Sequence, residues 1–91
     1  GQLQLCGELY APESGRLLTI HTTQPGVQVY TGNWLTGCPA GKNGHVYNNN
    51  DGVAIECQNY PDAPNKADYP TCVLRPGETF EQAIIFAFSV R

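Results

Sequence analysis

One carboxylate in the sequence stands where it could act as a general base. Glu56 lies in Val53–Gln58, a segment whose other members carry no charge. Side chains alternate between the faces of a strand, so Glu56 shares its face with Ala54 and Gln58. A carboxylate among apolar neighbours costs free energy if it is buried unpaired, and such a group suits proton abstraction. On the pattern alone, a solvent-exposed Glu is the more common explanation.

A second group of side chains suits the recognition of a sugar. Gln28 and Tyr30 share one face of Val27–Thr31, and Trp34 follows shortly after. An amide can bond hydroxyl groups, and aromatic rings can cover the C–H face of a sugar ring. The alternatives are ordinary cross-strand pairing for Gln28 and a core or loop anchor for Trp34.

Other polar residues give weaker indications of a functional site. His21 and His45 have no carboxylate or Cys at metal-ligand spacing, so the sequence predicts no metal site. Asp62 is predicted to cap local backbone amides in a turn. The segment Gly41–Gly44 lacks the first Gly and the final Ser or Thr of a P-loop, so no phosphate site is predicted.

Composition narrows the class of partner. The 91 residues, enough for one domain, carry a net charge of −3 and five scattered basic residues, which excludes a nucleic-acid surface. The longest apolar stretch, Ala83–Phe88, is far shorter than the roughly 20 residues of a membrane-spanning helix. Charged residues make up only 14% of the chain, against the usual quarter or so. This low charge indicates that other protein covers part of the surface.

The four cysteines leave two alternatives open. They are Cys6, Cys38, Cys57 and Cys72. Their wide spacing fits no zinc site. Either all four are reduced and behave as small hydrophobic residues, or at least two of them form a disulfide. The chain has no glycosylation sequon, and we expect a cytoplasmic protein.

Period-two alternation between turn signals predicts an all-β, antiparallel fold built as a sandwich or part of one. The predicted strands are Gln2–Tyr10, Arg16–Thr22, Val27–Thr31, Val53–Gln58 and Phe80–Val90, with a short extended stretch at Thr71–Leu74. We expect strict alternation in the first strand and a hairpin between the first two. The long loop Gly32–Gly52 is of a length typical of functional or packed loops.

Four motifs, in order, resemble those of the aldose 1-epimerase (mutarotase) family, and its animal members most. They are Gln24–Asn33, Gly41–Gly44 with Tyr47, Ala54–Asn65, and Leu74–Glu78 followed by Phe86–Val90. The resemblance covers essentially the whole chain. It implies interconversion of the α and β anomers of free hexoses such as galactose and glucose, with no metal or organic cofactor. By motif position, it implies that Glu56 is the catalytic base and that Gln28 contacts the substrate.

The resemblance also implies that residues 1–91 are a single C-terminal part of a larger β-sandwich of the mutarotase type. The family's acid His lies in an N-terminal portion, and neither His21 nor His45 stands in that motif. We therefore expect the missing N-terminal portion of the same protein as a partner. Two other hypotheses stay open: a non-catalytic carbohydrate-binding module of the same fold, and a small interaction domain stapled by disulfides.

Overall fold

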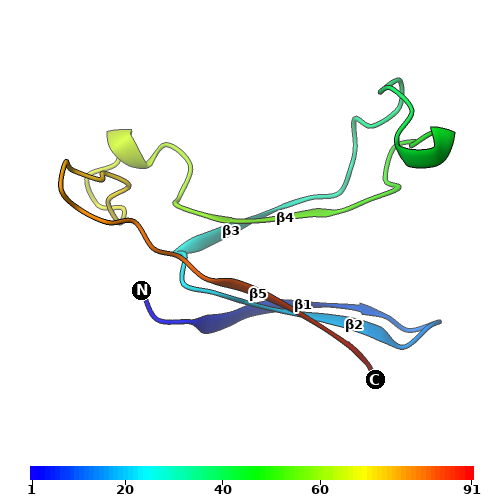
Figure 1. Cartoon of the computed structure of the whole chain (residues 1–91), viewed down its shortest axis with the longest axis horizontal. Coiled ribbons are helices and arrows are strands. Elements are labelled where there is room, and N and C mark those ends of the chain that lie inside the picture. The colour runs from blue at the N-terminus through cyan, green and yellow to red at the C-terminus, as the bar shows by residue number, and fades with distance from the viewer.

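The computed structural model describes residues 1–91 and is almost entirely β-structure (Figure 1). The elements are β1 (Gln4–Ala11), β2 (Arg16–Thr22), β3 (Gly26–Tyr30), η1 (Lys42–Gly44), β4 (Ala54–Gln58), η2 (Ala63–Asn65) and β5 (Ile84–Val90). Every strand pair is antiparallel, in a three-stranded sheet of order β1-β2-β5 and a two-stranded sheet of β3 and β4. The predicted fold class is thus confirmed. Both helices are single turns, and no helix is long and apolar enough to cross a membrane.

The three-stranded sheet grows from a local hairpin. The turn between β1 and β2 closes through Gly15, whose amide donates to the Ala11 carbonyl at 2.8 Å. Gly15 has φ +74°, a left-handed conformation that glycine adopts without strain. Strand β5 then pairs along the other edge of β2 from Ile84 to Val90, which makes β2 the central strand.

A connection of three residues, Thr23–Pro25, carries the chain from β2 to β3. The two sheets lie one above the other and come together at this crossing (Figure 1). Ile20 and Thr22, at the end of β2, are only 2% and 4% exposed. The other buried apolar residue is Ala63 of η2, at 7% exposed, so the core of the chain is very small.

Three details of the sequence prediction are wrong. Strict alternation in the first strand fails because the register shifts between Leu5 and Gly7, leaving Cys6 as the extra residue of a β-bulge. The last strand starts at Ile84 rather than Phe80 because its partner β2 ends at Thr22. Residues 71–74 form no strand, since no neighbouring strand is there to pair with them.

The chain buries little of its surface. Its accessible area is 7158 Å², whereas a compact protein of this mass exposes about 5,200 Å². Its radius of gyration is 16.7 Å, against about 12 Å for a compact domain of this length. Phe88 and Val90 are 78% and 75% exposed. The sheets therefore leave much of their apolar surface exposed to solvent.

The isolated 91-residue chain should for this reason lack a cooperative unfolding transition. Calorimetry should show no peak near the usual enthalpy of about 0.7 kcal/mol per residue. The chain should also bind a dye that reports exposed apolar surface. A sharp, reversible transition of full enthalpy in the monomeric chain would contradict this prediction.

Candidate functional site

The two side chains that the sequence singled out for chemistry lie opposite one another. Gln28 of β3 is the direct cross-strand partner of Glu56 of β4. Directly opposed residues of an antiparallel pair have Cβ atoms about 4.5–5.5 Å apart. Both side chains are exposed. The fold thus places an amide and a carboxylate side by side on one open face, where one bound hydroxyl group could contact both.

This face points away from the three-stranded sheet. Alternation along β4 puts Cys57 on the opposite face from Glu56. The nearby Cys57 helps to raise the pKa of Cys6, which belongs to the three-stranded sheet, so Cys57 lies on the side of β4 that faces this sheet. Gln28 and Glu56 lie on the opposite, outer face of the β3–β4 pair.

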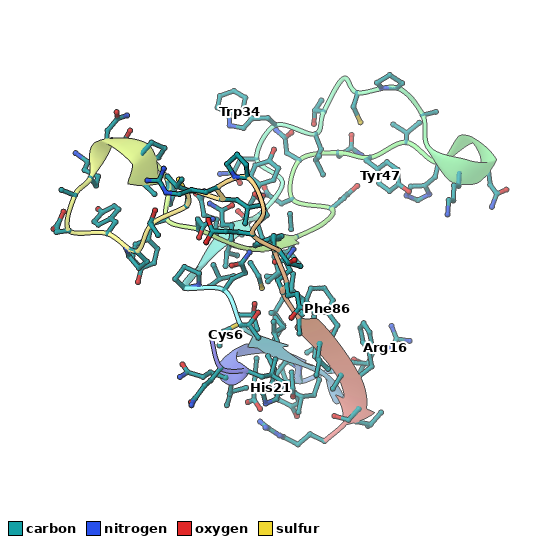
Figure 2. All side chains as sticks on the ribbon, turned by 60° about the vertical axis from the view of Figure 1, so that its left-hand side comes forward. Cys6, Arg16, His21, Trp34, Tyr47 and Phe86 are labelled. Carbon is teal, nitrogen blue, oxygen red and sulfur yellow. The ribbon has the colours of Figure 1, made fainter.

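Tyr30 connects the start of the long loop to this outer face. It lies on the same face as Gln28, and its cross-strand partner is Ala54. Its phenol oxygen accepts a hydrogen bond from the Trp34 backbone amide at 3.0 Å. The Trp34 ring stays 86% exposed, so it is neither a core residue nor a packed loop anchor (Figure 2).

The base of the loop is braced by polar side chains. The Asn50 side chain donates to the Thr31 carbonyl at 2.8 Å, and its backbone amide donates to the Gly32 carbonyl at 2.8 Å. Further out, the Asn49 side chain accepts from the Thr36 amide at 2.8 Å. These bonds continue the β3–β4 pairing into the loop. The asparagines Asn49 and Asn50 therefore fix the conformation of the loop.

A small cavity of about 220 Å³ lies beside the Tyr30–Ala54 pair, next along the strands from Gln28 and Glu56. Its lining includes Leu35 and Val53 and is mostly apolar. A hollow of this kind can take the C–H surface of a small ligand whose hydroxyl groups reach the amide and carboxylate.

The remaining polar candidates lie elsewhere. His21 pairs with Leu5 and Ile85 in the three-stranded sheet, and the ring of His45 packs on Tyr47 with centroids 4.6 Å apart. Neither histidine is placed beside the Gln28–Glu56 pair. Asp62 lies at the start of η2 with φ +64°, but the prediction that its side chain caps backbone amides is wrong. Its carboxylate instead accepts a hydrogen bond from the Asn65 side chain and forms an ion pair with Lys66 at 3.7 Å, so its role is still structural. No cluster of three His, Cys, Asp or Glu side chains could hold a metal ion.

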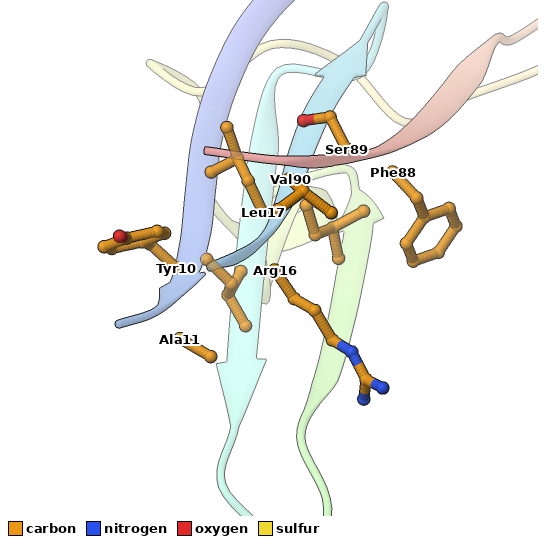
Figure 3. Close-up of a pocket in the computed structure, with 9 residues that line it drawn as sticks. Tyr10, Ala11, Arg16, Leu17, Phe88, Ser89 and Val90 are labelled. Atoms are coloured by element: carbon orange, nitrogen blue, oxygen red, sulfur yellow. The ribbon is translucent and has the colours of Figure 1, made fainter. Parts of the chain in front are cut away.

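A larger hollow, of about 650 Å³, lies on the three-stranded sheet and not at this pair (Figure 3). Leu17, Phe88 and Val90 are among its lining residues, and seven of the nine are hydrophobic. It offers too few polar groups to orient a sugar. We interpret it as part of the uncovered apolar face.

Comparison with known proteins shows the family to which this chain belongs. The family model described as aldose 1-epimerase matches residues 1–87. The chain therefore belongs to the aldose 1-epimerase family. It is 49% identical over 85 residues to a galactose mutarotase of Homo sapiens and 47% identical over 87 residues to that of Rattus norvegicus. It is 31% identical over 87 residues to an aldose 1-epimerase of Escherichia coli.

These matches cover 93% to 96% of the chain but only 25% of each relative. The chain thus spans about a quarter of the length of the relatives it matches. This ratio agrees with the small core and the large exposed surface described above.

Sequence reasoning missed how the loop is held. It assigned Tyr30 to the polar face but gave no partner for the phenol group, because the Trp34 amide reaches it only through the loop conformation. It also missed that Asn50 bonds the backbone at the base of the loop. Asn50 has φ +68°, a left-handed conformation that Asn adopts more readily than most residues. The residue type was therefore the one signal in the sequence that could have indicated a special role at this position.

Replacing Tyr30 with Phe should loosen the start of the loop without unfolding the sheet. Losing one hydrogen bond of about 1 kcal/mol should speed hydrogen exchange at the Trp34 amide roughly fivefold. Mass spectrometry of the loop peptide in the complete protein measures this rate. The control is Tyr47→Phe in the same loop, which should leave the Trp34 amide unchanged. Equal exchange rates in both variants would show that the hydrogen bond is unimportant.

Proposed function

We propose that this chain supplies the catalytic base of an aldose 1-epimerase that interconverts the α and β anomers of galactose or glucose. The observation that carries the proposal is the direct pairing of Gln28 with Glu56 on an open face. Membership of the family and the names of the relatives support the reaction class.

In this reaction Glu56 removes the proton from the C1 hydroxyl while an acid protonates the ring oxygen. The ring opens, the C1–C2 bond rotates, and the ring closes on the other face. The base needs a carboxylate within hydrogen-bond reach of the hydroxyl. The Gln28 amide, fixed across the strand pair, donates to or accepts from a neighbouring hydroxyl and so orients the sugar over Glu56.

We further propose that the acid and the remaining sugar contacts come from an N-terminal portion of the same polypeptide, with residues 1–91 as its C-terminal part. The chain has no histidine at the Gln28–Glu56 pair, and its relatives are about four times as long. The same portion would cover the exposed apolar faces.

Glu56→Gln in the full-length polypeptide should slow mutarotation at least ~100-fold, the low end for loss of a general base. Polarimetry of fresh α-galactose measures the rate above the uncatalysed reaction. The matched control is Glu13→Gln in the exposed β1–β2 turn, which should leave the rate unchanged. A Glu56→Gln enzyme with a near wild-type rate and an unchanged melting temperature would contradict the assignment.

Gln28→Ala should weaken substrate binding more than it slows the chemical step. The loss of one neutral hydrogen bond predicts a KM raised roughly 2- to 10-fold, with a smaller change in kcat. Progress curves at several galactose concentrations separate the two constants. A large fall in kcat with KM unchanged would instead assign Gln28 to the transition state.

A non-catalytic carbohydrate-binding role is the second candidate, and the 86% exposed Trp34 ring favours it. An exposed indole is a platform on which a sugar ring can stack. Calorimetric titration with galactose and polarimetry on the same full-length sample distinguish the two functions. Heat of binding without acceleration of mutarotation would favour the binding module.

A further inference from the structure

We propose that Cys6 and Cys57 are a dithiol that small-molecule disulfides oxidise to a reversible disulfide between the two sheets. This modification site is independent of the sugar chemistry. It would link β1 to β4 directly behind Glu56.

The topology brings these two cysteines together from distant parts of the sequence. Cys6 follows Leu5, whose partner His21 lies near the end of β2. Cys57 pairs with Val27, near the start of β3. Only the connection Thr23–Pro25 separates β2 from β3. The two cysteines therefore lie on strands that flank the crossing where the sheets meet.

The bulge in β1 contributes to the contact. Cys6 is the residue that has no cross-strand partner, and a bulge re-aims a side chain that the pleat would otherwise direct. Cys6 lies at the crossing of the two sheets (Figure 2). Cys57, on the inward face of β4, lies near enough to Cys6 to contribute to the raised pKa of its thiol.

The thiols are free and within reach of small reagents. All four cysteines of the chain are unlinked, with Cys6 exposed and Cys57 half-buried. Desolvation of the Cys6 thiol by the surrounding chain, together with the nearby Cys57, raises the pKa of Cys6. The protonated thiol of Cys6 is therefore favoured while the pair is reduced.

Glutathione disulfide is a sufficient oxidant. The Cys57 thiolate attacks one sulfur of glutathione disulfide, forms a mixed disulfide and releases one glutathione thiolate. Cys6 then loses its proton and attacks the Cys57 sulfur, which forms the protein disulfide and releases the second glutathione. Two protein thiols are oxidised and one external disulfide is reduced. The disulfide forms when the two neighbouring sulfur atoms approach to the S–S bond length of about 2.05 Å.

The test is peptide mapping of the full-length polypeptide after treatment with glutathione disulfide, without reducing agent. The expected product is a Cys6–Cys57 cross-linked peptide that dithiothreitol removes, while Cys38 and Cys72 carry glutathione or stay free. Glutathione adducts on both Cys6 and Cys57, unmodified thiols at both, or a cross-link of either to Cys38 or Cys72 would overturn the proposal.

A pair of variants makes the test specific. In Cys6→Ser, Cys57 has no second thiol to displace glutathione, so it should accumulate a stable glutathione adduct. Cys38→Ser, in the exposed loop, should leave the Cys6–Cys57 cross-link intact. Loss of the adduct from Cys57 in Cys6→Ser, with the fold preserved by circular dichroism, would also overturn the proposal. None of these readouts depends on mutarotase activity.

Discussion

The register of β3 against β4 is the constraint on which the candidate site depends. Because side chains alternate, a slip of one residue would turn Glu56 onto the inward face and bring a valine opposite it. The register is held at both ends of the pair. At the start of β3, Gly26 lies so close to the Tyr60 ring that an added Cβ would come within 2.8 Å of it. At the far end, Asn50 bonds the backbone at Thr31 and Gly32.

The same register places the carboxylate and the thiol of β4 on opposite faces of the strand. Glu56 and Cys57 are neighbours in sequence, yet Glu56 lies on the outer face and Cys57 lies on the side near Cys6 of the three-stranded sheet. Alternation therefore separates a solvent-facing carboxylate from a thiol pair at the sheet crossing. A shift of β4 relative to β1 would move both Glu56 and Cys57, since both lie on this one strand of five residues.

Local sequence was enough to find the strands and the two candidate residues, because alternation and turn residues act over a few positions. The bounds of β2 were predicted without error, and those of β3 and β4 within one residue. The pairing of Gln28 with Glu56 could not be predicted from these patterns, because β3 and β4 meet across a long loop. The bulge at Cys6 and the late start of β5 could not be predicted from local patterns either. Each depends on the register with the partner strand β2.

The incomplete burial and, on the proposed function, the need for an acid from outside these residues have a common physical origin. The β3–β4 sheet has two strands, so both of its edges carry unpaired backbone groups that another strand can bond. A strand added beside β4 would place side chains about 4.5–5.5 Å from Glu56, on the same outer face. That strand would satisfy the open edge, and the protein behind it would cover apolar surface. On the proposed function, an acid carried by the same portion lies across the bound sugar from Glu56. Completing the fold would therefore also complete the acid–base pair.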